Sequence, residues 1–302
     1  MGKIIRTPEN SFENLENYDF QSHYIDIAEG LRMHYLDEGN KNSPVVLLLH
    51  GEPSWSYLYR NMIPVLADKF RVIAPDLIGF GKSDKFVDKK DYSYQKHLDW
   101  ISAFITKIDL KNILLFCQDW GGLIGLRIIT ELSDRFDMVV ASNTTLPTGM
   151  VAMPESFLKW REYSQYSPGF DIGKVIDMGT VQALSEEVYK AYNAPFPSEE
   201  FKAGARIFPT LVPVEADDPE SIKNRKAWDK LKSWQKPFLT IFGEKDTIMI
   251  GAEKAFQKLI PGASGQQHEI LHAGHFIQEE KGEELAALII QFYDKNTNNS
   301  TS

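Results

Sequence analysis

The segment Asn112-Ile-Leu-Leu-Phe-Cys-Gln-Asp-Trp-Gly-Gly-Leu-Ile-Gly-Leu-Arg127 contains a sharp turn from a strand into a helix. Its apolar run from Ile113 to Cys117 is typical of a strand in a parallel sheet that helices cover on both faces. After the turn, apolar residues recur at helical spacing, and the adjacent glycines allow the strand and the helix to approach closely. This pattern predicts a nucleophile elbow, in which the residue at the apex is held in a strained conformation. The apex residue is Asp119.

An aspartate at this apex favours one kind of chemistry. Its carboxylate has a reference pKa of about 4, so it is anionic at neutral pH without help from a base. A carboxylate is a poor nucleophile toward esters and amides, but it can attack a saturated carbon that bears a leaving group. The product is an ester on Asp119, which water must then cleave. The alternative is that Asp119 only caps the N-terminus of the following helix, a common role of aspartate.

Length and composition indicate a globular protein with a substantial core. The chain has 302 residues, 43% of them hydrophobic, which suits one large domain or a domain with an insertion. A net charge of -9 gives no reason to expect binding to nucleic acid or to an anionic membrane. The single cysteine, Cys117, excludes a disulfide framework and indicates a reducing compartment. With no export signal and no long apolar run, we expect a soluble cytoplasmic protein.

Strands and helices alternate along the first half of the chain. A helix is predicted at 94–108, directly before the strand that leads to Asp119. Such alternation indicates an α/β fold with a mostly parallel sheet, in which ligands bind at the carboxyl ends of the strands. Besides the strand at 113–117, strands are predicted at 44–50, 70–76 and 138–142, with an edge hairpin at 23–28 and 31–36.

The pattern changes in the second half. Prolines crowd residues 147–233, where no strand is evident, and the strand pattern resumes at 237–243. We therefore predict a first core part at 1–146 and a helical cap, or lid, at 147–233. A second core part should follow at 234–295, with a disordered polar tail at 296–302. Such a cap would close a pocket over the elbow, exclude water and suit an apolar substrate.

Two further residues complete a candidate catalytic triad. Asp246 follows the resumed strand, and His275 follows the next predicted strand at 267–272. The chain order Asp119, Asp246, His275 is that of nucleophile, acid and base in the triad of α/β hydrolases. His275 would activate the water that cleaves the ester, and Asp246 would orient its ring and stabilise the imidazolium.

Other residues compete for these roles. His272 and Glu244 precede His275 and Asp246 by a few residues, but they lie nearer the strand ends and are less favoured. His50 ends the predicted strand 44–50 and could act as a base, although a histidine in that place more often anchors the following loop by a hydrogen bond.

The loop that begins at Gly51 follows a central strand directly. A backbone N–H in such a loop can point to the place where the neighbouring strand delivers its nucleophile. That group and the backbone N–H of Trp120, the residue after the nucleophile, would together form an oxyanion hole.

Five motifs stand out along the chain: His50-Gly-Glu-Pro-Ser-Trp-Ser-Tyr-Leu-Tyr-Arg60, Asp76-Leu-Ile-Gly-Phe-Gly-Lys-Ser-Asp84, Gln118-Asp-Trp-Gly-Gly122, Gly243-Glu-Lys-Asp246 and Gly274-His275. With these motifs the chain resembles the haloalkane dehalogenases of the α/β-hydrolase superfamily. The resemblance covers nearly the whole chain, is most specific at the Gly-Glu-Pro turn and at Asp-Trp-Gly-Gly, and is weaker in the cap. It implies a mostly parallel eight-stranded sheet, helices on both faces and an inserted helical cap.

The resemblance also implies residue roles. Asp119 would displace halide by SN2 attack, and His275 with Asp246 would hydrolyse the resulting ester. Trp120 corresponds to the family's first halide-binding tryptophan; an indole N–H suits this role because it is neutral and only donates. Glu52 would supply its backbone N–H to the oxyanion hole, and its carboxylate could hold the hydrolytic water.

The second halide donor of the family is either an asparagine in the turn or a tryptophan from the cap. Here the turn holds Glu52, whose ionised carboxylate cannot donate, so the donor should come from the cap. Trp160 is the best candidate, although it could instead be an aromatic packed beneath the cap. Asn143 stands where the other subgroup carries its catalytic acid, which agrees with Asp246 as the acid here.

We therefore expect a monomeric enzyme that converts a haloalkane and water to a primary alcohol, halide and a proton. No metal or organic cofactor, no nucleic acid and no membrane is expected among its partners. An epoxide hydrolase is the main alternative, since it shares the aspartate nucleophile and protonates the epoxide through cap tyrosines. A small-molecule receptor is a second alternative. The tyrosines that keep the epoxide hydrolase open are Tyr163, Tyr166, Tyr189 and Tyr192.

Overall fold

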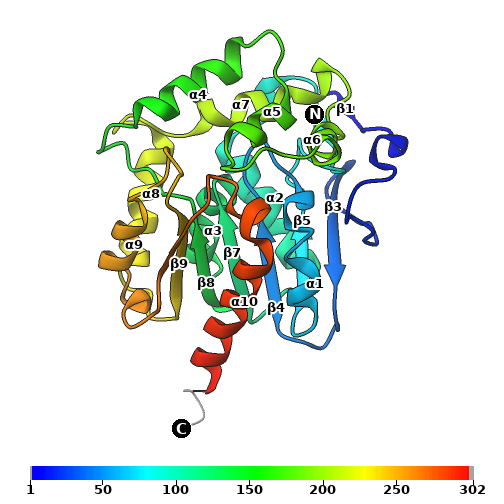
Figure 1. The fold of residues 1–302 in the computed structure, drawn as a ribbon. Helices are drawn as coiled ribbons and strands as arrows, with labels where there is room; N and C mark the ends of the chain where they lie inside the picture. Colours follow the sequence, from blue (N-terminus) through cyan, green and yellow to red (C-terminus); the bar gives the residue numbers. More distant parts are fainter. Residues whose placement is uncertain (1, 299–302) are drawn as a thin grey trace.

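A computed structural model of the protein describes residues 2–298 (Figure 1). Its centre is an eight-stranded sheet in the order β10-β9-β8-β7-β4-β5-β3-β2. The pairs from β10 to β5 are parallel, whereas β3 runs antiparallel to both β5 and β2. The predicted eight-stranded, mostly parallel sheet is therefore confirmed. The strands of this sheet are β2 (His23–Ala28), β3 (Leu31–Glu38), β4 (Val45–Leu49), β5 (Arg71–Pro75), β7 (Ile113–Gln118), β8 (Phe136–Ser142), β9 (Phe238–Gly243) and β10 (Glu269–Leu271).

Helices cover both faces of this sheet. α1 and α10 lie in front of it in Figure 1, and α2 and α3 lie behind it. Because both faces are covered, every residue of β7 is buried, which explains its uninterrupted apolar sequence. The α-helices that flank the sheet are α1 (Ile63–Ala67), α2 (Tyr94–Lys107), α3 (Trp120–Glu131), α8 (Pro219–Leu231), α9 (Glu253–Leu259) and α10 (Ile277–Asn298).

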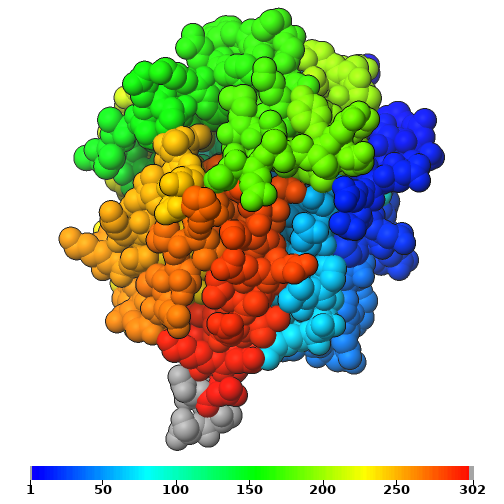
Figure 2. All heavy atoms as spheres, in the orientation of Figure 1, coloured from blue at the N-terminus to red at the C-terminus, as the bar shows by residue number. Residues whose placement is uncertain are grey.

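The segment between β8 and β9 is helical throughout its described elements. Four of its α-helices lie above the sheet, over the carboxyl ends of the parallel strands (Figure 1). In the space-filling view these residues form a green layer on top of the core (Figure 2). The four helices are α4 (Glu155–Tyr166), α5 (Ile172–Met178), α6 (Glu186–Asn193) and α7 (Ala203–Leu211).

Helix α8 lies inside the segment that the sequence assigns to the cap, but it packs against α3 of the core. The Arg127 guanidinium joins the two helices through a 3.0 Å ion pair with Glu220 and a 3.0 Å hydrogen bond to the Asn224 side chain. The layer over the strand ends therefore consists of α4 to α7.

Short elements complete the chain. β1 (Ile4–Ile5) and β6 (Lys85–Phe86) form a separate antiparallel pair that the sequence analysis does not predict, because two residues show no period. The short 3-10 helices are Glu9–Phe12, Ser56–Tyr59, Lys89–Asp91, Ser133–Arg135, Glu199–Lys202 and Pro261–Ala263.

The C-terminus differs from the expected tail. Helix α10 continues to Asn298, so residues 296–298 of the predicted disordered segment are helical, and residues 299–302 lie outside the described part. No helix within residues 2–298 is long and apolar enough to cross a membrane.

Candidate active site

Asp119 occupies the predicted elbow. β7 ends at Gln118 and α3 begins at Trp120, so Asp119 alone makes the turn, with φ 50° and ψ −124°. Residues other than glycine rarely adopt such a positive φ, which marks a strained position. A Cβ atom at Gly121 would overlap the Leu49 carbonyl, so the turn requires glycine there. The resulting geometry presents the carboxylate of Asp119 at the carboxyl edge of the sheet.

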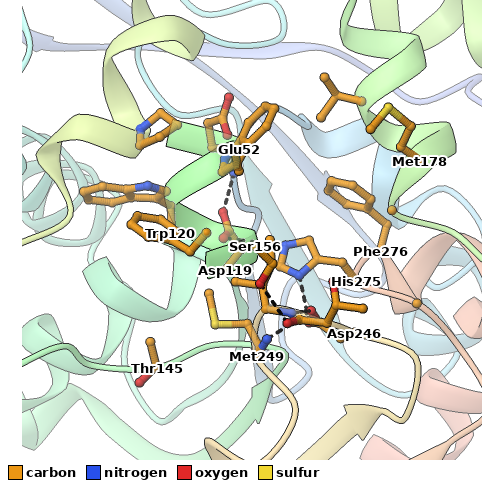
Figure 3. A pocket seen from close by; sticks show the side chains of 18 of the residues that line it. Glu52, Asp119, Trp120, Thr145, Ser156, Met178, Asp246, Met249, His275 and Phe276 are labelled. Atoms are coloured by element: carbon orange, nitrogen blue, oxygen red, sulfur yellow. Dashed lines mark hydrogen bonds and ion pairs between the residues drawn. The ribbon is translucent and has the colours of Figure 1, made fainter. Parts of the chain in front are cut away.

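His275 and Asp246 lie beside this carboxylate, as the triad hypothesis expects. His275 Nδ1 is 2.8 Å from Asp246 Oδ2, and His275 Nε2 is 3.6 Å from Asp119 Oδ2 (Figure 3). The Asp246 side chain is buried, and its Oδ1 accepts hydrogen bonds from the backbone N–H groups of Ile248 (2.9 Å) and Met249 (3.0 Å). A carboxylate held in this way can fix the orientation of the imidazole.

The competing residues lie elsewhere. Glu244 and His272 pair with each other, and the His272 side chain is 64% exposed. His50 is buried, donates through Nδ1 to the Gly51 carbonyl (2.8 Å) and accepts at Nε2 from the Leu77 backbone N–H (2.9 Å). Burial also lowers its pKa. His50 therefore anchors the loop as a neutral imidazole.

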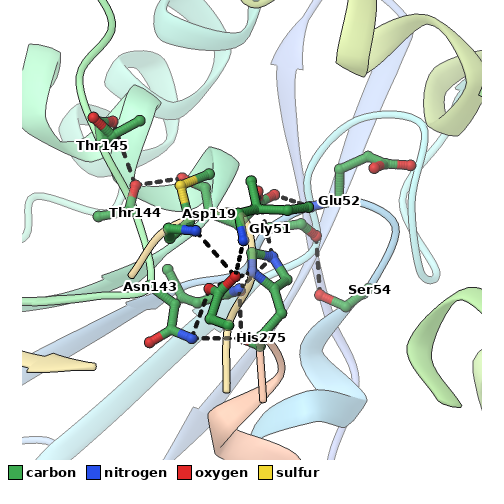
Figure 4. A network of polar contacts seen from close by, with 12 residues as sticks. Gly51, Glu52, Ser54, Asp119, Asn143, Thr144, Thr145 and His275 are labelled. Carbon is green, nitrogen blue, oxygen red and sulfur yellow. Dashed lines mark hydrogen bonds and ion pairs between the residues drawn. The ribbon is translucent and has the colours of Figure 1, made fainter. Parts of the chain in front are cut away.

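The Asp119 carboxylate accepts a hydrogen bond from one of the two backbone groups that the sequence analysis considers. The backbone N–H of Glu52 donates to Asp119 Oδ1 at 2.7 Å (Figure 4). Trp120 is the first residue of α3, so its N–H belongs to the helix-start groups that have no partner within the helix. Asp119 Oδ1 is thus bound by an N–H donor, while Oδ2 faces His275.

The site shifts the pKa of three groups. Burial lowers the pKa of His275, but the charges of Asp246 and Asp119 outweigh this effect and raise it to about 10. Burial raises the pKa of Asp246, yet His275 and the backbone donors bring it below its usual value. The pKa of Glu52 is raised well above its usual value by burial and then by Asp119. The sequence predicts an ionised Glu52, whereas this environment favours its protonated form.

A cavity of about 490 Å³ connects these groups with the cap. Trp120 and Trp160, the two predicted halide-binding residues, both line it. Trp120 is 3% exposed and packs edge-on against Phe208, with ring centroids 4.5 Å apart. Trp160 is partly buried and stacks on Tyr163. The remaining wall is mostly apolar, which suits an uncharged substrate.

The structure adds residues that sequence reasoning did not assign. Asn143 donates from Nδ2 to Asp246 Oδ2 (2.9 Å) and accepts at Oδ1 from the Gly243 N–H (2.8 Å). Thr144 donates its hydroxyl to the backbone carbonyl of Asp119 at 2.8 Å. Both follow β8 directly, and this place at the carboxyl edge of the sheet was the signal that could have identified them (Figure 4).

Within the described part of the chain, no group of three or more potential side-chain ligands is placed to hold a metal ion.

Comparisons with known proteins agree with this architecture. Residues 44–282 match the family model described as alpha/beta hydrolase fold. The chain is 53% identical over 300 residues to the haloalkane dehalogenase of Psychrobacter cryohalolentis, covering 97% of this chain and 99% of that protein. It is 50% identical to the haloalkane dehalogenase of Mycolicibacterium paratuberculosis, covering 96% of this chain and 98% of the relative.

A solved structure of a haloalkane dehalogenase has the same fold. Haloalkane dehalogenase DpaA from Paraglaciecola agarilytica superposes with a TM-score of 0.88 at 37% identity, covering 94% of this chain and 97% of that one. That structure is tetrameric, which counts against the expected monomer. From the matched fold, the identities and their coverage, this chain belongs to the haloalkane dehalogenase family of α/β hydrolases.

Proposed function

We propose that this protein hydrolyses haloalkanes to a primary alcohol, halide and a proton through an ester on Asp119. The observation that carries the proposal is the placement of the Asp119 carboxylate. Glu52 N–H binds its Oδ1 at 2.7 Å, and its Oδ2 lies 3.6 Å from His275 Nε2 in a mostly apolar cavity. One oxygen is held while the other can attack.

In the first step, Asp119 Oδ2 forms a bond to the carbon that carries the halogen. The carbon–halogen bond breaks at the same time, and the halide leaves with the bonding electron pair. The cavity shields both reactants from bulk water, which strengthens each electrostatic interaction inside it. The indole N–H groups of Trp120 and Trp160 would then donate to the departing halide.

Ester formation changes the state of His275. Asp119 loses its negative charge in the ester, so one of the two carboxylates that raise the pKa of His275 towards about 10 no longer does so. The pKa of His275 must fall, which makes the neutral imidazole available as a base. His275 therefore becomes able to act as a base only after the first step is complete.

In the second step, neutral His275 takes a proton from a water molecule as that water attacks the ester carbonyl carbon. The negative charge develops on Asp119 Oδ1, next to the backbone N–H groups of Glu52 and Trp120. Collapse of this intermediate breaks the ester bond and transfers a proton to the alcohol. Oε1 of Glu52 is buried without a hydrogen-bond partner among the described residues, and it would contact the attacking water.

The arrangement of the cap tyrosines favours a dehalogenase over an epoxide hydrolase. Of the tyrosines considered, Tyr163 lines the cavity, whereas Tyr166 is 80% exposed. The Tyr189 hydroxyl donates to Asp171, and the Tyr192 hydroxyl donates to Glu279. A pair of tyrosines that could protonate an epoxide is therefore not assembled within the described residues.

We expect the protein to release bromide from 1-bromobutane over many turnovers and to leave 1,2-epoxybutane unreacted. Bromide titration and gas chromatography of the products measure the two reactions. Multiple turnovers would also exclude a receptor that only binds its ligand. Hydration of the epoxide without any bromide release would instead favour the epoxide hydrolase.

Replacing Trp160 with phenylalanine tests the second halide donor. Trp160→Phe keeps the aromatic packing against Tyr163 but removes the indole N–H, so we expect dehalogenation to fall by about 10- to 1,000-fold. Bromide should also quench the remaining tryptophan fluorescence less strongly at equal concentration. As a control, Trp228→Phe removes an indole whose N–H donates to the Leu146 carbonyl outside the cavity. Full activity of Trp160→Phe would exclude this residue as a donor.

A further inference from the structure

The cap loop 179–182 packs closely against residues 274–276, the loop that carries His275; this contact is called the seam below. The Gly179 carbonyl, in the loop between α5 and α6, accepts a hydrogen bond from the His275 backbone N–H at 2.7 Å. A Cβ atom at Gly274 would overlap the same Gly179 carbonyl, so the two backbones are in direct contact. Residues 179–181 and 274–276 line the cavity together. The seam is therefore part of the wall that faces the substrate.

Glu280 bridges the two sides of this seam. It lies in the first turn of α10, and its Oε2 accepts from the Gly274 backbone N–H at 2.7 Å. Its Oε1 accepts from the backbone N–H groups of Val181 (2.8 Å) and Gln182 (3.3 Å) in the cap. One carboxylate thus satisfies three backbone donors on two segments that are far apart in sequence.

The contacts of the Glu280 carboxylate do more than stabilise the start of helix α10. An acidic side chain in the first turn interacts favourably with the helix dipole. The bond to Gly274, three residues before the start of α10, also fixes the chain that enters the helix. The bonds to Val181 and Gln182 lie outside the helix and add nothing to its capping. They connect the cap to the residue directly before His275.

We propose that Glu280 is a positioning residue that fixes the cap loop 179–182 to the loop of His275 and so keeps the imidazole in place for ester hydrolysis. The inference rests on the proposed function, because it assigns Glu280 to the second of two chemical steps. Asp246 holds the imidazole ring, and the side chains of Gln118 and Asn143 donate to the His275 carbonyl from the core. The His275 N–H, in contrast, is held by the cap at Gly179. Movement of the cap loop would therefore remove the contact on this side of His275 and loosen its position.

The two chemical steps should respond differently to the loss of this bridge. Alkylation uses Asp119 and the halide donors, none of which contacts Glu280, whereas hydrolysis depends on His275. A displacement of about 1 Å in a catalytic group can slow a step by about 100-fold. The loss of Glu280 should consequently slow hydrolysis and spare alkylation.

Rapid-quench kinetics with 1-bromobutane tests this prediction in the full-length protein. In Glu280→Ala, we expect the bromide burst to stay within about twofold of the unsubstituted protein while ester hydrolysis slows by about 10- to 100-fold. The ester on Asp119 should accumulate in the mass spectrum. Glu280→Gln retains one acceptor oxygen and should be intermediate. Glu283→Ala, at an exposed position of α10 just beyond its kink at Lys281, is the matched control and should change neither step.

Hydrogen exchange provides an independent readout. Peptides covering 179–182 and 274–276 should both exchange faster in Glu280→Ala, because the carboxylate binds an N–H on each side. Equal slowing of the burst and of hydrolysis, or no change in either, would overturn the positioning role, and Glu280→Gln provides the same comparison if the alanine variant does not fold. No bromide release and no ester on Asp119 in the unsubstituted protein would instead overturn the proposed function.

Discussion

Asp119→Ala should lose dehalogenase activity, with turnover falling by on the order of 10⁴-fold or more. The side chain is the only group that the elbow presents at the apex, and without it no ester can form. Halide release from 1-bromobutane measures the loss. Binding of bromide, followed by tryptophan fluorescence, should persist because Trp120 and Trp160 remain in the cavity. Retained turnover in this variant would exclude Asp119 as the nucleophile.

The same variant should change the titration of His275. Burial lowers the pKa of His275, and the charges of Asp246 and Asp119 raise it to about 10. Removing the negative charge of Asp119 destabilises the imidazolium, so the pKa must move down from that value. An NMR titration can follow the His275 resonance, which is identified by its absence from His275→Phe. An unchanged or higher pKa would contradict the electrostatic coupling between the two steps.

His275→Phe should stop the reaction after its first step. Alkylation does not need a base, so we expect one bromide released per protein molecule and a stable alkyl ester on Asp119. Steady-state turnover should fall by about 10²- to 10⁴-fold, the range in which a positioned general base contributes. Intact-protein mass spectrometry after incubation with 1-bromobutane detects the ester, and bromide titration gives the stoichiometry.

His272→Phe is the matched control for that experiment. His272 lies three positions earlier, pairs with Glu244 and is 64% exposed. Its replacement should leave turnover unchanged and no ester should accumulate. If His272→Phe accumulated the ester while His275→Phe remained active, the assignment of the base would be reversed.

The sequence predicted the sheet and the candidate triad because each signal is local. Asp119 and Asp246 follow the buried apolar strands β7 and β9, and His275 follows the short edge strand β10, whose residues are half-buried or exposed. Parallel strands bring their carboxyl ends to one edge of the sheet. Each strand can be recognised from neighbouring residues alone. The approach of these side chains then follows from the topology without knowledge of any single contact.

Other features depend on contacts between distant segments. Glu280 looks like an ordinary acidic residue in a helical first turn until the cap loop is seen against it. Helix α8 has a helical pattern like those of the cap, and only its pairing with α3 through Arg127 shows where it packs. The protonation preference of Glu52 follows from burial, which the turn motif does not reveal.

The central claim is that the oxygen of the alcohol comes from Asp119 and is replaced by water. A single turnover of 1-bromobutane in H₂¹⁸O tests it most directly, with mass spectrometry of the alcohol and of the peptide containing Asp119. The predicted result is an unlabelled alcohol and one ¹⁸O atom in the Asp119 carboxylate. A labelled alcohol with an unlabelled Asp119 would show that water attacks the haloalkane directly and would contradict the ester mechanism.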